Sequence, residues 1–273
     1  MVTVGIGVIE VIIGIVSGSI ALIADGIHSF ADAFVSFIVW LGLKISRRAP
    51  DGKFHFGYYR VETFSAILAA LIMIGVGAII LYGSYLAFLT VREVLFPVLA
   101  MTVTLLAAIV SLALAFYKRR IAKRIDSLSL AADVYNTIAD GLTSLIAFSG
   151  VFFSYLGLPQ TDAIAGMIIA GFLFVVTFSI IKEASLVLMD ACTCPEVVET
   201  IRQTTESVEG VKGVRDIKLR KLGSFIIGEM HIEVDGNISV YNADAVVTKI
   251  EKLVKDQIVE LEWLTIKVKP ATK

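Results

Sequence analysis

Charged residues are scarce in this chain, and their scarcity points to a membrane protein. Only 18% of its 273 residues are charged, while 57% are hydrophobic. The net charge of −1 gives no sign of a nucleic-acid partner. Two cysteines are too few for a disulfide framework. The H-E-x-x-H pattern of helical zinc hydrolases is missing, so we do not expect an enzyme.

Long uncharged runs fill most of residues 1–190. Residues 63–91 and 94–117 contain no Asp, Glu, Lys or Arg, and each run exceeds the ~20 residues with which a helix crosses a bilayer. Glu10 interrupts the first apolar run and no basic leader precedes it, so we expect a retained helix rather than a signal peptide. The pattern predicts six membrane helices, at about 2–20, 22–45, 60–86, 93–118, 129–156 and 161–187.

Basic residues cluster after the second and the fourth predicted helices. They are Lys44, Arg47, Arg48 and Lys53 in the first group and Lys118, Arg119, Arg120, Lys123 and Arg124 in the second. The connections on the other side carry almost no basic residues, apart from Arg92. Because short basic loops stay in the cytoplasm, we expect both groups and both chain termini to be cytoplasmic. We therefore predict an integral protein of the plasma (inner) membrane.

Residues 191–273 have the composition of a soluble domain. Residues 195–208 fit a helix, and two strands at 214–222 and 225–234 are joined at Gly223-Ser224, a suitable pair for a two-residue hairpin turn. A helix over 239–255 and a strand over 261–268 complete the order α-β-β-α-β. This order predicts a small α+β domain.

One nonapeptide occurs twice, at residues 24–32 and 132–140, with the shared pattern A-D-x-x-(H/N)-(S/T)-x-A-D. His28 and Asp32 are four residues apart, as are Asn136 and Asp140, so each pair projects from one face of its helix. Carboxylates are costly within a bilayer. The alternative is that these groups only pair with one another and hold helices together. Two copied sets exceed what packing requires, so we predict a buried cation site.

Three further acids are accessory candidates for this site. Asp25 and Asp133 precede the central residue of each copy by three positions and lie on nearly the same faces. Glu10, in the first helix, either supports the site or relays protons, or it pairs with another intramembrane polar group. One imidazole with three oxygen donors suits Zn, Mn, Fe or Co better than Cu(I).

The chain resembles the cation diffusion facilitator family over essentially its whole length. The resemblance rests on the two helix motifs above and on three further segments: Ser17-Gly18-Ser19 followed by Leu22 to Asp25, Phe56 to Glu62, and Leu188-Met189-Asp190. It implies a membrane domain of six helices (1–190) and a ferredoxin-like cytoplasmic domain (191–273). It also implies a homodimer that exports a divalent metal from the cytoplasm in exchange for protons, with no cofactor.

One departure from the family pattern bears on the metal. Zinc-type members commonly carry histidine where this chain has Asn136, and an amide oxygen is a harder ligand than an imidazole. This change favours manganese, iron or cobalt, whereas His28 favours zinc. The ligand set therefore gives zinc and manganese nearly equal preference. Histidine has a reference pKa near cellular pH, which makes His28 the natural candidate for proton coupling. The alternative function is a metal-binding sensor or scaffold that does not transport.

Other residues are weaker candidates. By resemblance, Arg60 and Asp190 form a charge pair that holds the dimer together; the alternative is two solvated charges. His231 and Asp244 fall where relatives bind regulatory metal. However, Arg215, Lys267 and Lys269 replace the other ligands, so we expect that site to be lost. A further metal site in the loop at Asp51 and His55 is not expected. Cys192 and Cys194 are expected to be free thiols rather than ligands.

Overall fold

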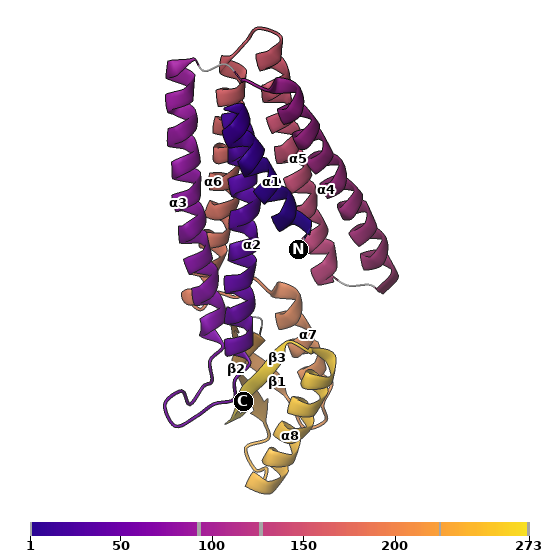
Figure 1. Ribbon diagram of the computed structural model, residues 1–273. Coiled ribbons are helices and arrows are strands. Elements are labelled where there is room, and N and C mark those ends of the chain that lie inside the picture. The colour runs from indigo at the N-terminus through magenta and orange to yellow at the C-terminus, as the bar shows by residue number, and fades with distance from the viewer. Residues whose placement is uncertain (1, 92–93, 126–127, 224, 272–273) are drawn as a thin grey trace. The chain divides into compact units, whose positions relative to one another are not determined.

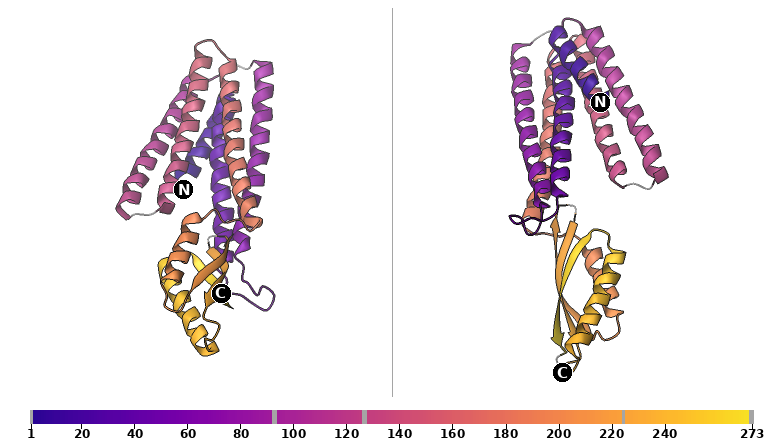
Figure 2. Two further views of the ribbon diagram at one scale, coloured as in Figure 1. Left: turned by 180° about the vertical axis from the view of Figure 1, so that it is seen from behind. Right: turned by 60° about the horizontal axis from the view of Figure 1, so that its bottom comes forward.

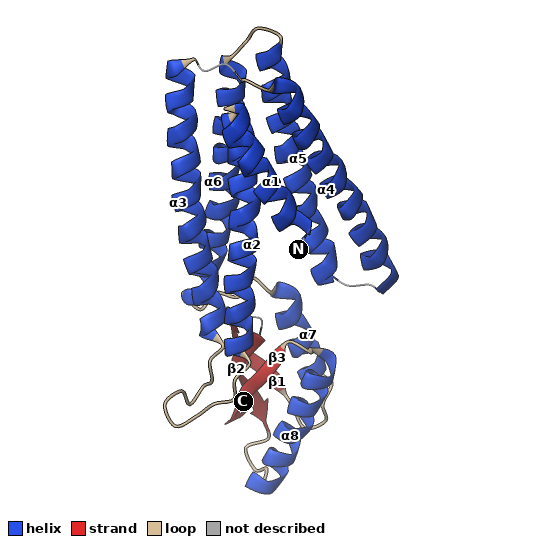
Figure 3. Ribbon diagram, viewed as in Figure 1, coloured by secondary structure: helices blue, strands red, loops and turns tan. Residues whose placement is uncertain are grey.

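The computed structural model describes residues 2–91, 94–125, 128–223 and 225–271, except for the side chains of residues 2–3 and 122–133 (Figure 1). Six helices come first: α1 (Val2–Ser17), α2 (Ile20–Ser46), α3 (Arg60–Thr90), α4 (Pro97–Ile125), α5 (Leu128–Tyr155) and α6 (Gln160–Leu188). They are followed by α7 (Pro195–Glu206), β1 (Gly213–Leu222), β2 (Phe225–Val234), α8 (Val240–Gln257) and β3 (Leu261–Pro270) (Figure 3). The predicted fold class, membrane helices followed by an α+β domain, is confirmed.

Five of the described helices, α2 to α6, are long and apolar enough to cross a membrane. Helix α1 is apolar but has only 16 residues. Helix α4 continues past its predicted end to Ile125, because lysine and arginine are good helix formers. Arg119 and Arg120 are therefore helical, and the prediction that they belong to a loop is wrong, whereas Lys118 lies in the helix as predicted.

The chain divides into two compact units. The first contains residues 1–38 and 68–180, which form most of the helical region. The second contains residues 39–67 and 181–273, so the C-terminal domain is grouped with the adjoining ends of α2, α3 and α6. The predicted boundary at residue 190 stays a prediction.

The C-terminal domain is a three-stranded sheet covered on one face by α7 and α8 (Figure 2, right). The strand order is β1-β2-β3, with β1 and β2 antiparallel and β2 and β3 parallel. Alternation along β2 buries Met230, Ile232 and Val234 against Ile201 of α7 and Ile250 of α8. The strand pattern read from the sequence therefore identifies the face that meets the helices.

A buried carboxylate anchors the start of α2. Asp162 of α6 accepts hydrogen bonds from Ser19 Oγ at 2.6 Å and from the backbone N of Ile20 at 2.7 Å. The first backbone N–H groups of a helix lack partners within the helix, and an anion there also interacts favourably with the helix dipole. Asp162 is therefore satisfied by α2 and positions the helix that carries the first copy of the repeated motif.

Close backbone packing joins α1 to α2. A Cβ atom added at Gly26 would lie 2.8 Å from the backbone oxygen of Gly7 and 2.8 Å from the backbone nitrogen of Val11. Backbone atoms cannot yield as a flexible side chain can. Glycine at this position therefore sets how closely α1 approaches the motif of α2.

We expect Gly26→Ala to lower the free energy of unfolding by about 1–3 kcal/mol, the range for an overpacked interior. Gly5→Ala on α1 is the matched control, because an added Cβ there meets no atom within 4 Å. Thermal unfolding of the detergent-solubilised protein compares the two variants. Equal unfolding temperatures would refute the close packing inferred for Gly26.

Candidate metal centre

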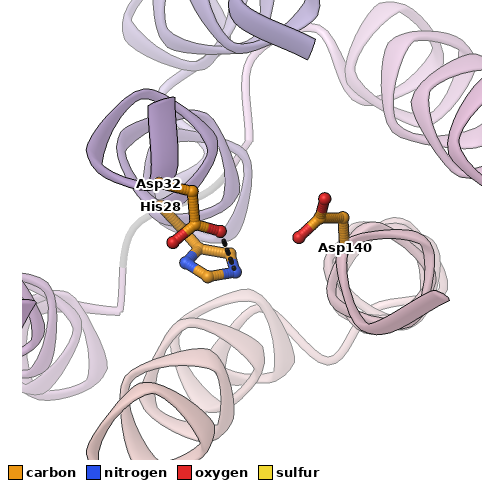
Figure 4. Close-up of side chains that lie close together, drawn as sticks. All are labelled: His28, Asp32 and Asp140. Atoms are coloured by element: carbon orange, nitrogen blue, oxygen red, sulfur yellow. Dashed lines mark ion pairs between the residues drawn. The ribbon is translucent and has the colours of Figure 1, made fainter. Parts of the chain in front are cut away.

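His28, Asp32 and Asp140 converge within the helical unit (Figure 4). Each offers one ligand atom, and the three atoms lie within 4.8 Å of one another. His28 and Asp32 share one face of α2, with His28 Nε2 3.5 Å from Asp32 Oδ2. Asp140 faces them from α5 (Figure 4). Among the described residues, this is the only such group of three or more His, Cys, Asp or Glu side chains.

The three side chains open onto a cavity of about 300 Å³. Asn136, one helical turn before Asp140, also lines this cavity, and its side chain is exposed. His28 is buried, whereas Asp32 and Asp140 are partly accessible. The structure thus brings three predicted ligands together and places the fourth on the same cavity wall. An imidazole nitrogen and oxygen donors in a cavity suit a borderline or hard divalent cation.

The accessory acids differ in what the structure describes. Glu10 and Asp25 are both 0% exposed, and none of their carboxylate oxygens has a hydrogen-bond partner among the described residues. Buried anions without partners are costly, so Glu10 and Asp25 stay accessory candidates for interaction with a cation. The side chain of Asp133 lies outside the described residues.

Two polar residues of the helical unit were missed as functional candidates. Lys118 lines the same cavity as His28, Asp32 and Asp140, and its Nζ donates a hydrogen bond to Thr137 Oγ1 at 2.9 Å. It was missed because it begins a basic cluster that resembles a cytoplasmic loop. Asp162 was detectable, since it alone separates the uncharged runs 141–161 and 163–181.

A charge network in the second unit includes the predicted pair. Arg60 Nη2 lies 3.0 Å from Asp190 Oδ1, and Arg220 Nη1 of β1 lies 3.2 Å from Asp190 Oδ2. Asp190 adopts a left-handed backbone conformation with φ of 61°. Asp and Asn tolerate this conformation better than most residues. Asp190 therefore connects the start of α3 to the sheet, while its role in a dimer stays a prediction.

Among the described residues, the other candidates of the C-terminal domain do not form a cluster of potential metal ligands. His231 Nδ1 lies 3.0 Å from Asp216 Oδ2, and Asp244 is exposed on α8. Arg215 and Lys267 form ion pairs with Glu233 and Glu229 respectively. Cationic side chains cannot act as metal ligands.

The cysteines and the loop acid are both engaged in local structure. Cys192 and Cys194 form a disulfide, so the expectation of free thiols is wrong. Their Cα atoms are 5.3 Å apart, within the range that a disulfide spans.

In the loop before α3, hydrogen bonds from the Tyr58 hydroxyl and from the backbone N–H groups of Phe54 and Lys53 lower the pKa of Asp51. The Asp51 carboxylate therefore stabilises the turn in which it lies.

Asp190→Asn should lower the free energy of unfolding by about 0.5–2 kcal/mol, because two exposed pairs are lost and each contributes about 0.2–1 kcal/mol. Asparagine keeps the backbone conformation accessible. Lys212→Gln, which removes one isolated exposed pair with Asp235, is the control and should cost less. Chemical denaturation of the full chain measures both. A cost for Asp190→Asn no larger than the control would contradict the network.

The long apolar helices define an integral membrane protein, and several acidic side chains are buried among them. Residues 1–189 match the model of the cation efflux transmembrane domain, and residues 194–271 match that of the cation efflux protein cytoplasmic domain. The chain belongs to the cation efflux family, the cation diffusion facilitators, whose members are transporters and not enzymes.

Three curated bacterial relatives, all from Bacillus subtilis, show the extent of the similarity. The uncharacterized transporter YdbO is 33% identical over 226 residues, which is 83% of this chain and 78% of the relative. The manganese efflux system protein MneS is 27% identical over 226 residues, with the same coverage of 83% and 78%. The manganese efflux system protein MneP is 28% identical over 253 residues, covering 89% of this chain and 84% of the relative.

Proposed function

We propose that this protein exports a divalent transition metal from the cytoplasm in exchange for protons, with His28, Asp32, Asn136 and Asp140 as the transport site. The observation that carries the proposal is the convergence of His28, Asp32 and Asp140 on a cavity within the membrane helices. A metal site in a membrane interior that opens onto a cavity has room for an ion to enter and leave.

Proton coupling follows from the chemistry of the proposed ligands. A metal binds a neutral imidazole and ionised carboxylates, so its arrival displaces any protons that these groups carry. His28 supplies the imidazole of the set, which must be neutral to bind the metal. Protons that enter as the metal leaves would restore the empty site.

Manganese and zinc are the proposed substrates, with iron and cobalt next. Two relatives, MneS and MneP, are described as manganese efflux proteins. The amide of Asn136 adds a hard oxygen donor, which supports manganese, while the imidazole of His28 supports zinc. The carboxylates of Asp32 and Asp140 accept either metal.

The membrane arrangement completes the proposal. Residues 1–190 form the transport domain, and residues 191–273 form a cytoplasmic domain through which two copies of the chain assemble as a homodimer. Both termini are cytoplasmic in the plasma (inner) membrane. The charge network of Arg60, Asp190 and Arg220 joins α3 to the C-terminal domain in each copy.

We expect purified protein in proteoliposomes to accumulate manganese or zinc when the lumen is acidic, and to stop when the pH gradient is collapsed. Asp32→Asn and Asp140→Asn should each reduce this uptake by more than about 100-fold, because losing even a partner of a metal ligand costs 10–100-fold. Asp256→Asn makes the same chemical change at an exposed acid of α8 and should transport normally.

Three outcomes of that experiment decide between functions. Full uptake by Asp140→Asn would remove the site from the proposal. Uptake that ignores the pH gradient would remove proton coupling and leave transport standing. Metal binding by the protein without any uptake would instead indicate a sensor or scaffold.

The residue at position 136 should control the choice of metal. Asn136→His replaces an oxygen donor by an imidazole, so we expect the ratio of zinc to manganese uptake to rise about tenfold. Asn136→Asp retains an oxygen donor and should not raise this ratio. A competition assay with both metals present measures it, and an unchanged ratio in Asn136→His would place Asn136 outside the ligand set.

A further inference from the structure

The cavity that would receive the transported cation also contains a fixed positive charge. Lys118 of α4 lines it together with His28, Asp32 and Asp140. The ammonium donates a hydrogen bond to Thr137 Oγ1 at 2.9 Å, and Thr137 lies three residues before Asp140 on α5. The next two residues of the basic cluster, Arg119 and Arg120, are exposed and do not line the cavity.

A lysine in this position acts on the metal and on the empty site in opposite directions. Like charges repel strongly where water is partly excluded, so the ammonium raises the free energy of a divalent ion bound nearby. When the metal has left, the same charge stabilises the two carboxylates of Asp32 and Asp140. Both effects shift the equilibrium from the loaded site toward the empty one.

We propose that Lys118 is an internal counter-cation of the transport site, which weakens divalent-metal binding and thereby promotes release. This inference rests on the proposed function and adds the means by which the site avoids holding its substrate too tightly. Conduction and transport both require that an ion bind well enough to enter and weakly enough to leave. In this chain, the position of Lys118 supplies the second condition.

The hydrogen bond to Thr137 fixes the position of the Lys118 ammonium. Lysine has a long flexible side chain whose charge otherwise turns toward water. Here Thr137 Oγ1 holds the ammonium against α5, the helix that carries Asn136 and Asp140. The ammonium is thereby kept close to the helix that supplies two of the proposed ligands.

The test compares charge removal inside and outside the cavity. Equilibrium manganese binding to the full-length detergent-solubilised protein is measured by calorimetry for the wild type, Lys118→Gln, Lys118→Met, Lys118→Arg and Arg119→Gln. We expect the dissociation constant to fall about tenfold in Lys118→Gln and Lys118→Met, because one unit of repulsion is lost. Lys118→Arg keeps the charge and should stay within about twofold of the wild type.

Arg119→Gln is the matched control, since it removes the same charge from the adjacent exposed position. Its effect should be small and should vanish at about 0.5 M salt, where exposed charges are screened, while the effect at Lys118 persists. In proteoliposomes, the Lys118→Gln rate at saturating manganese should fall even though its binding is tighter.

Several results would overturn the inference. One is a manganese affinity in Lys118→Gln and Lys118→Met that is equal to or weaker than that of the wild type. Another is a gain in affinity no larger than the gain in Arg119→Gln. A double variant, Asp32→Asn with Asp140→Asn, serves as a background that separates this failure from failure of the proposed function, and its manganese binding is measured in the same way. If the background abolishes manganese binding, the site stands whatever Lys118 does. If it leaves binding intact, the proposed site fails and the inference fails with it.

Discussion

Carboxylates within the membrane interior are the constraint on which this structure depends. A carboxyl group in a medium of low dielectric constant is stable only when it is protonated, or when a cation or several hydrogen-bond donors lie beside it. Asp162 shows the structural solution, because it accepts hydrogen bonds from the start of α2. Glu10 and Asp25 find no such partner among the described residues. His28, Asp32 and Asp140 differ again, because they line a cavity where the proposed metal ion would balance their charge.

These solutions support one another through helix packing. Asp162 anchors α2 at its first turn, and the close approach of α1 at Gly26 fixes the helix two residues before His28. The motif of α2 is thereby presented to α5 from a backbone with little freedom to move. Rigid supports of this kind keep ligand atoms near a productive geometry, and a small displacement of either helix changes the affinity for a metal.

The second unit is stabilised by different physics. Its sheet buries aliphatic side chains against α7 and α8, while the connection to α3 is a set of exposed charges centred on Asp190. Exposed ion pairs are weak and sensitive to salt. A link of this type holds a geometry without the rigidity of an apolar core. That property suits a domain attached to helices that must move during transport.

Local patterns in the sequence predicted the fold class, the element order and the face of β2 that is buried, because helix and strand periodicities involve neighbouring residues. They also predicted His28 with Asp32, and Asn136 with Asp140, because a spacing of four places two side chains on one helix face. Contacts between helices needed the three-dimensional structure. The position of Lys118 in the cavity, the anchoring of α2 by Asp162 and the addition of Arg220 to the pair at Asp190 all join residues distant in sequence. The pattern along one helix does not specify such contacts, since they depend on how the helices pack.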